Sequence, residues 1–292
     1  MAGWIGIDLG ATWIRIAALG DAGGMHRIIP TPAPHALKHF VHAIRDAVIL
    51  VGIPLSVGLA RAPGIDSAGV ICSWPSRTDW LGVPLLDIIR NHTGKFPHHM
   101  DDGTAAASWE SADARHAGKT AASVVIGTGL AIGCAQNGIP METGNGAYTP
   151  AHEHVEGWDA PCRCGKCGCL QTMLSGGGLL MVMAMNRAHA LKIVGVALEN
   201  AGKSLCQRYG AEQLVISGNI LLNPEVKAFL VESLSHYCRE NIIFSAVPQV
   251  TVIGGALLAA AIGRQFQEGA INEELPELHR VILSGLMRHM TA

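Results

Sequence analysis

Short apolar runs and turns alternate over the first thirty residues in a pattern that is typical of strands. Residues 4–7 and 14–19 are two such runs on either side of a loop, and a turn at residues 21–24 leads into a third run at 25–29. From residue 37 to residue 51 the apolar positions instead recur at helical spacing. The chain is therefore predicted to open with three strands followed by a helix.

The remainder of the first half continues this alternation. Two further strand-like runs precede a short helix, and an acidic pair then marks the end of a strand and the start of another helix. The strands are predicted at residues 55–59 and 70–72, the short helix at 84–90 and the second helix at 104–114. This order favours an open sheet whose strands are connected by helices.

The second half repeats the opening of the first. Residues 123–126 and 132–135 are strand-like runs around a second glycine loop, and Asn137-Gly138 is a hairpin signal. The later elements are predicted as a helix at 179–208, a strand at 214–216, a helix at 224–239, a strand at 249–253, a helix at 254–263 and a tail helix at 273–290. Because 292 residues exceed one average core, we expect two α/β lobes, residues 1–117 and 118–292. The tail helix is expected to pack back on the first lobe.

Each half carries a glycine-containing loop of a kind that binds phosphate. In Asp8-Leu9-Gly10-Ala11-Thr12 the glycine lets main-chain N–H groups face an anion, and the threonine adds a hydroxyl donor. Asp8 could orient Mg²⁺ through water, because this ion prefers oxygen ligands. The second loop, Gly127-Thr128-Gly129, offers a further set of donors. Either loop alone could be an ordinary turn, but matching loops in both halves favour a phosphate site.

The acidic pair Asp101-Asp102 precedes a predicted helix and permits two interpretations. An aspartate at this place can cap the helix by accepting a backbone N–H. Alternatively, one carboxylate can act as a general base that takes a proton from an alcohol during phosphoryl transfer. The local sequence does not decide between these interpretations.

One segment has the residue types and spacing of a metal site. His152, Cys162, Cys164 and Cys169 form the pattern H-x9-C-x-C-x4-C, and three thiolates with one imidazole can complete a tetrahedral zinc shell. The alternative is a disulfide with neighbouring cysteines, and Cys167 or His154 could compete as ligands. A C-x-C arrangement suits a metal better than a disulfide, so we expect a structural zinc-binding insertion at residues 149–171.

Composition excludes several classes of protein. The chain is 49% hydrophobic and 15% charged with a net charge of −2, which gives no basic patch for a nucleic acid. No signal peptide is expected at the N-terminus, and the longest apolar runs are too short to span a bilayer. Eight cysteines, half of them in the metal-binding stretch, suit a reducing cytoplasm. We therefore expect a cytoplasmic protein that acts on a small molecule.

The two loops, the His–Cys pattern and Ser175-Gly176 together resemble the ROK family of sugar kinases, over residues 4 to about 263. The cysteine motif is the most specific part of the resemblance. It implies the actin-like ATPase fold, a duplicated ribonuclease H-like α/β architecture, with ATP and Mg²⁺ in the cleft between two lobes. It also implies a homodimer.

By position, the resemblance assigns Asp102 as the base and Asp101 as a sugar ligand in place of the family's asparagine. His152 would bind zinc beside the sugar pocket. The resemblance makes the two glycine loops the phosphate loops, and Ser217-Gly218-Asn219 would contact the nucleotide.

The chain departs from the family where the sugar is held. Thr149 and Gln171 stand where the family has glutamates, and Thr and Gln bind hydroxyls more weakly than carboxylates do. Glu153 or Glu156 in the same loop could replace the missing glutamate. The resemblance implies an ATP-dependent kinase for a hexose or an N-acylhexosamine. The alternatives are a catalytically weak or inactive sugar-sensing protein and a zinc-stabilised interaction protein.

Overall fold

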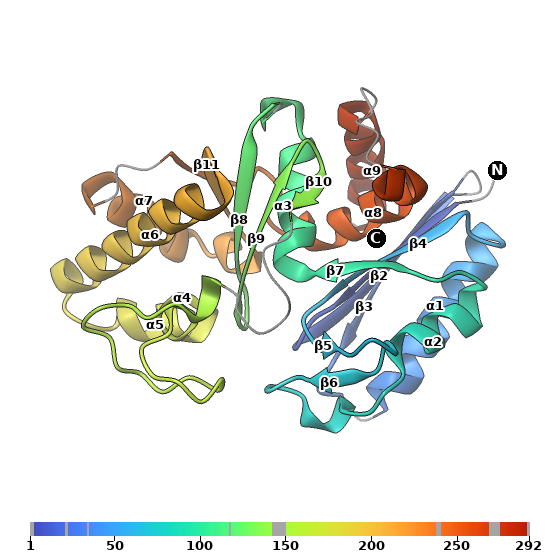
Figure 1. The fold of residues 1–292 in the computed structure, drawn as a ribbon, viewed down its shortest axis with the longest axis horizontal. Coiled ribbons are helices and arrows are strands. Elements are labelled where there is room, and N and C mark those ends of the chain that lie inside the picture. Colours follow the sequence, from blue (N-terminus) through green and yellow to red (C-terminus); the bar gives the residue numbers. More distant parts are fainter. Residues whose placement is uncertain are drawn as a thin grey trace.

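Two five-stranded sheets with the same strand order form the framework of the protein (Figure 1). The computed structural model describes residues 3–20, 23–33, 35–116, 118–141, 150–237, 241–268 and 275–290. The first sheet has the order β3-β2-β1-β4-β7 and the second the order β10-β9-β8-β11-β12. In each sheet three antiparallel strands continue into two parallel ones. The predicted duplicated α/β fold is confirmed.

The strands of the two sheets correspond one to one. The first sheet contains β1 (Trp4–Leu9), β2 (Trp13–Gly20), β3 (Gly23–Pro30), β4 (Ser56–Arg61) and β7 (His98–Asp101). The second contains β8 (Thr120–Ile126), β9 (Leu130–Gln136), β10 (Ile139–Met141), β11 (Gln213–Ser217) and β12 (Ile242–Phe244). A small hairpin of β5 (Gly64–Ile65) and β6 (Ile71–Ser73) extends from the first lobe.

The helices connect and cover these sheets. They are α1 (Ala36–Val51), α2 (Leu85–Thr93), α3 (Asp102–Ala112), α4 (Leu170–Leu174), α5 (Gly176–Met183), α6 (Arg187–Tyr209), α7 (Pro224–Tyr237), α8 (Thr251–Glu268) and α9 (Leu275–Met290). Short 3₁₀ turns lie at Thr78–Trp80, Ala114–His116, Pro150–His152 and Asn219–Leu222. Over the described ranges no helix has the length and apolar character that a membrane crossing requires.

Two sequence predictions are wrong in detail. The run at 249–253 is not a strand, because α8 begins at Thr251 and the last strand is β12. A short apolar run does not distinguish a buried strand from a buried helix. The helix predicted at 179–208 is two helices, because Asn186 accepts a hydrogen bond from the His189 N–H and caps a new helix, α6.

Helices α3 and α8 lie between the two sheets (Figure 1) and pack on each other. Helix α8 covers β1 and β4, while α3 covers β8 and β9. These contacts bring backbones very close together. An added Cβ at Gly58 of β4 would lie 1.8 Å from the Ala256 carbonyl oxygen, and one at Gly255 would lie 1.9 Å from that of Ala105. Glycine is therefore required at both contacts.

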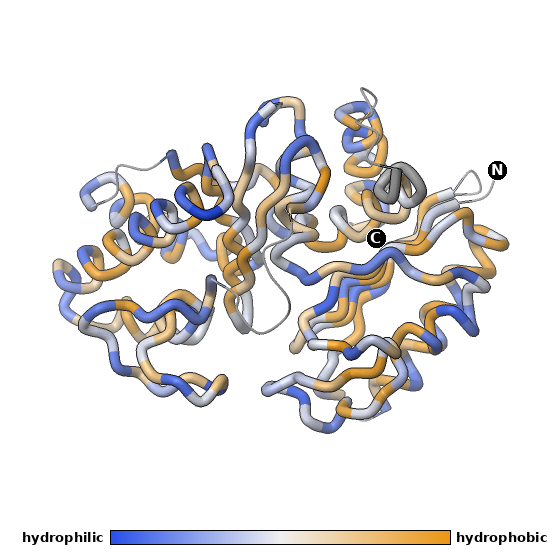
Figure 2. Tube along the Cα trace, in the orientation of Figure 1, coloured by the Kyte–Doolittle hydropathy of each residue, from blue (hydrophilic) through white to orange (hydrophobic). Residues whose placement is uncertain are grey.

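Apolar residues follow the strands and the helix faces that cover them (Figure 2). One buried cluster belongs to each sheet, and a third combines residues of α3, α8 and α9. The C-terminal helix α9 also contacts β2 and β3. The tail of the chain thus lies against the first sheet, and α3 extends from the third cluster toward the candidate site.

Candidate functional site

The two glycine loops meet although they are far apart in the sequence. The first joins β1 to β2 and the second joins β8 to β9. The hydroxyl oxygens of Thr12 and Thr128 lie 2.5 Å apart and share a hydrogen bond. The structure therefore brings together the two loops that the sequence predicts to bind phosphate.

Hydrogen bonds within the first lobe hold the first loop in shape. The Gly10 N–H donates to the Trp13 carbonyl oxygen at 3.1 Å. The buried Thr31 hydroxyl donates to the Gly10 carbonyl oxygen at 2.6 Å, and the Thr31 N–H donates to the Thr12 carbonyl oxygen at 2.9 Å. The Gly10 N–H is thus used inside the loop, and the Thr12 hydroxyl bonds to Thr128 of the second loop. Sequence analysis missed Thr31, because an isolated threonine beside a proline carries no signal of this contact.

Asp8 is buried and ion-paired. Its Oδ2 accepts a hydrogen bond from Arg15 Nη1 at 2.7 Å. Burial raises the pKa of the Asp8 carboxyl, and the charge and hydrogen bond of Arg15 oppose this rise. Sequence analysis did not assign a role to Arg15, although the strand register could have indicated one: Asp8 and Arg15 are directly opposite in the β1–β2 pair.

Asp101 and Asp102, for which the sequence permits either a helix cap or a general base, differ in their contacts. Asp101 caps α3, because its Oδ1 accepts the Thr104 N–H at 2.9 Å and its Oδ2 accepts the Thr104 hydroxyl at 2.6 Å. Asp102 is the first residue of the helix, and its Oδ1 accepts the Gly103 N–H at 3.0 Å. The capping role therefore belongs to Asp101, and Asp102, a half-buried residue at the start of α3, is the remaining candidate for the base.

The pKa of Asp102 is raised from its ordinary 3.8 to about 7. Burial is the main cause, followed by the negative charges of Asp101 and Asp8, while hydrogen bonds from backbone N–H groups oppose the rise. A carboxylate with this pKa can accept a proton near neutral pH. Arg61 lies opposite Asp101 in the β4–β7 pair. Burial lowers the pKa of the Arg61 guanidinium, and the negative charges of Asp101 and Asp102 oppose this decrease.

The second loop is tied to the segment predicted to bind nucleotide and to α5. The Gly176 N–H, at the start of α5, donates to the Gly127 carbonyl oxygen at 2.7 Å. Gly218 has a φ of 105° and lies so close to β8 that an added Cβ would be 2.2 Å from the Ile126 carbonyl oxygen. Asn219 begins the 3₁₀ turn that follows. Ser217 is fully buried, with its hydroxyl toward Ser123 and Thr251, so its side chain does not face a ligand.

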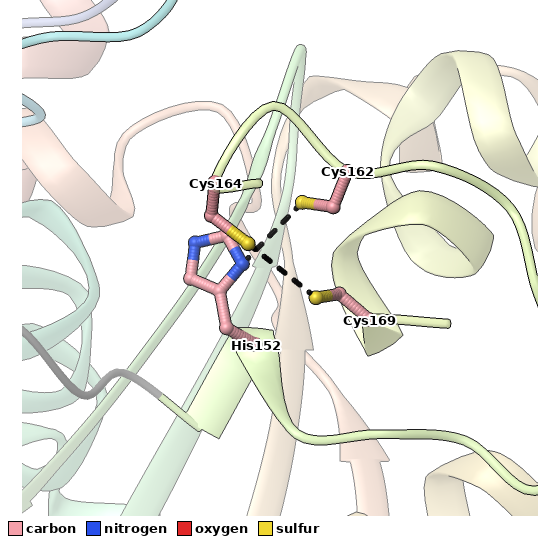
Figure 3. Close-up of side chains that lie close together, drawn as sticks. All are labelled: His152, Cys162, Cys164 and Cys169. Atoms are coloured by element: carbon pink, nitrogen blue, oxygen red, sulfur yellow. Dashed lines mark hydrogen bonds between the residues drawn. The ribbon is translucent and has the colours of Figure 1, made fainter. Parts of the chain in front are cut away.

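The four predicted metal ligands form one group (Figure 3). The ligand atoms of His152, Cys162, Cys164 and Cys169 all lie within 4.8 Å of one another. His152 Nδ1 is 3.5 Å from Cys162 Sγ, and the sulfurs of Cys164 and Cys169 are 3.6 Å apart. These cysteines are free thiols rather than a disulfide. Within the described part of the chain, neither His154 nor Cys167 belongs to this group.

Two glycines shape the metal-binding loop. Gly165 and Gly168 have φ values of 90° and 72°, a conformation that residues with a Cβ rarely adopt. At Gly168 an added Cβ would also lie 2.2 Å from the Trp158 carbonyl oxygen. These turns direct the thiols toward His152. Three sulfur donors and one imidazole nitrogen form a closed set that suits tetrahedral Zn²⁺.

The structure describes Glu153 and Gln171 among the remaining candidates for contact with the sugar. Glu153 does not replace the missing glutamate, because its Oε1 pairs with Arg208 Nη1 at 2.9 Å and accepts the Ser204 hydroxyl at 3.1 Å. It fixes the metal-binding loop to α6 instead. Gln171 contacts the second glycine loop and Cys162. Thr149 lies outside the described residues.

Comparison with known proteins identifies the family. The ROK family model matches residues 4–261. The chain belongs to the ROK family. A kanosamine kinase from Amycolatopsis mediterranei is 35% identical over 133 residues, which are 43% of this chain and 42% of that relative. The chain thus spans less than half of the kanosamine kinase.

Two further similarities extend over most of this ROK protein. A glucokinase from Thermotoga maritima is 23% identical over 88% of this chain and 82% of its own length. A ROK glucokinase from Streptomyces griseus, solved with glucose and AMPPNP, has a TM-score of 0.65 at 18% identity and covers 90% of this chain and all of that chain. The second likeness supports a shared fold.

The capping role of Asp101 in this ROK protein predicts a difference between two substitutions. Asp101→Ala removes the side-chain acceptor and should lower the free energy of unfolding by about 1 kcal/mol. Asp101→Asn keeps an acceptor for the Thr104 N–H and should retain most of the stability. Chemical denaturation of the three proteins measures this order, and equal stability of the alanine variant and the parent would show that the cap is unimportant.

Proposed function

We propose that this ROK protein is an ATP-dependent sugar kinase that phosphorylates a hydroxyl of a hexose or an N-acylhexosamine. The observation that carries this proposal is the meeting of the two glycine loops at Thr12 and Thr128. The raised pKa of Asp102 supports it. The kinase names of the relatives, and the AMPPNP and glucose bound to the Streptomyces griseus structure, support the same chemistry.

The proposed mechanism assigns a role to each group. Asp102 takes the proton of the acceptor hydroxyl of the sugar. The oxygen of that hydroxyl bonds to the γ-phosphorus of ATP, and the bond between this phosphorus and the bridging oxygen of ADP breaks. The Thr12 and Thr128 hydroxyls, which bond to each other in this structure, give up this bond and donate to phosphate oxygens. Asp8, fixed by Arg15, offers carboxylate oxygen for Mg²⁺, which neutralises phosphate charge when bound. These groups position reactants that would otherwise meet rarely.

Zinc is proposed as a structural ion held by His152, Cys162, Cys164 and Cys169. A shell of four protein ligands leaves no open position for a reacting water. The ion would therefore cross-link the loop rather than take part in phosphoryl transfer. A homodimer is proposed on the family resemblance alone.

Asp102→Asn should reduce phosphoryl transfer by about 10²-fold or more, because it removes the base while keeping the shape of the side chain. In the parent protein the rate should fall as pH decreases through about 7, since Asp102 works only when deprotonated. A coupled assay of sugar phosphorylation measures both effects. Asp46→Asn, on the exposed face of α1, is the matched control.

Stability provides an independent check on Asp102. Because the folded-state pKa is raised above 3.8, ionisation of Asp102 opposes folding. This penalty is absent below about pH 4, grows as pH rises to about 7 and is then constant. Asp102→Asn should therefore melt at a higher temperature than the parent at pH 8 but not at pH 4. Full activity together with unchanged melting at pH 8 would contradict the proposed role.

The purified protein should contain about one Zn²⁺ per chain. Cys164→Ser should lose the metal and lower the melting temperature, because metal binding and folding of this loop are coupled. Cys167→Ser changes a neighbouring exposed cysteine outside the ligand group and should keep both. Elemental analysis with thermal unfolding tests this, and equal zinc content in the two variants would disprove the ligand assignment.

A further inference from the structure

The side-chain amide of Gln171 lies between the metal-binding group and the second glycine loop. Gln171 is the second residue of α4 and follows Cys169 and Leu170. Its Oε1 accepts the Leu130 N–H at 3.4 Å, and its Nε2 donates toward Cys162 Sγ at 3.8 Å. A Cβ added to Gly129 would lie 3.4 Å from the same Oε1. One side chain thus contacts a metal-ligand candidate and the loop proposed to bind phosphate.

An amide suits this position for a chemical reason. Its oxygen accepts the backbone N–H of the loop, while its NH₂ group donates to sulfur. A metal-bound cysteine is a thiolate, and a donor to that sulfur stabilises its negative charge. A glutamate at this place could accept from Leu130 but would face the Cys162 thiolate with a like charge.

The contacts continue from the amide across the proposed site. Leu130 is the first residue of β9 and directly follows Gly129. In the same loop, Thr128 contacts Thr12 of the other lobe at 2.5 Å. A second connection runs through the backbone, because Gly176 donates to Gly127 at 2.7 Å. The second loop is therefore attached to the metal-binding segment through the Gln171 side chain, and to the start of α5 through a backbone hydrogen bond.

We propose that Gln171 is a positioning residue that couples occupancy of the metal site to the shape of the second glycine loop. Zinc then tightens nucleotide binding, and nucleotide tightens zinc binding by the same factor, because such coupling is reciprocal. This inference rests on the proposed function, since it takes the second loop as the nucleotide loop. Both amide contacts are long for hydrogen bonds, so we expect a factor of about five to ten, at the low end of such couplings.

The test measures binding rather than turnover. Calorimetry with AMPPNP and Mg²⁺ on zinc-loaded and zinc-stripped protein measures how many-fold zinc tightens nucleotide binding. Competition for Zn²⁺ with a chelator, with and without AMPPNP, measures how many-fold the nucleotide tightens zinc binding. Gln171→Leu keeps a similar side-chain size without either polar contact. This variant should bring the coupling factor between zinc and nucleotide binding close to one. It should also weaken zinc binding about tenfold, as the loss of a hydrogen-bond partner of a metal ligand does.

Gln207→Leu is the matched control, because Gln207 lies on the exposed surface of α6. It should keep the parent's factor. If the stripped protein unfolds, AMPPNP affinity is compared between zinc-saturated parent and Gln171→Leu, and the variant should bind several-fold more weakly. The inference is overturned if the zinc-saturated parent and Gln171→Leu bind AMPPNP equally well. It is also overturned if the coupling factor is unchanged in Gln171→Leu or equals one in the parent. Coupled binding without any sugar phosphorylation would instead overturn the kinase assignment alone.

Discussion

The close packing of α3 against α8 is the constraint on which the rest of the structure depends. Glycine at positions 58 and 255 lets the helix and strand backbones approach without intervening side chains. The two sheets are thereby brought together with their corresponding loops facing each other. Helix α3 begins at Asp102, which is close enough to Asp8 of the first loop for the charge of Asp8 to raise the pKa of Asp102.

Three carboxylates that lie close together determine the electrostatics of the candidate site. Asp8 lies near the carboxyl end of β1, and Asp101 ends β7, which is separated from β1 by β4 in the same sheet. Asp102 follows Asp101 at the start of α3. Arg15 neutralises Asp8, and Thr104 satisfies Asp101 by hydrogen bonds. Among the described residues Asp102 forms no salt bridge, and burial together with the charges of Asp101 and Asp8 raises its pKa to about 7. The arrangement separates the carboxylate that caps α3 from the one that we propose as the base.

The sequence predicted the duplication and the metal group because both depend on local spacing. The matched glycine loops identified two halves, and the H-x9-C-x-C-x4-C pattern identified four side chains that the structure places together. Features that depend on tertiary contacts were not predictable in this way. The division of roles between Asp101 and Asp102 needs the position of Thr104, and the attachment of Glu153 to Arg208 joins residues on separate elements. The strand predicted at 249–253 failed because its apolar run fits either a strand or a helix.

The most direct test is incubation of the protein with ATP, Mg²⁺ and a panel of hexoses and N-acylhexosamines, followed by mass spectrometry of the sugars. The account predicts that at least one sugar gains a phosphoryl group, and that glucose is a poor acceptor because the chain has Thr149 and Gln171 where the family has glutamates. No phosphorylated sugar across the panel, from protein that still binds AMPPNP, would contradict the account and favour a sugar-sensing protein without catalysis.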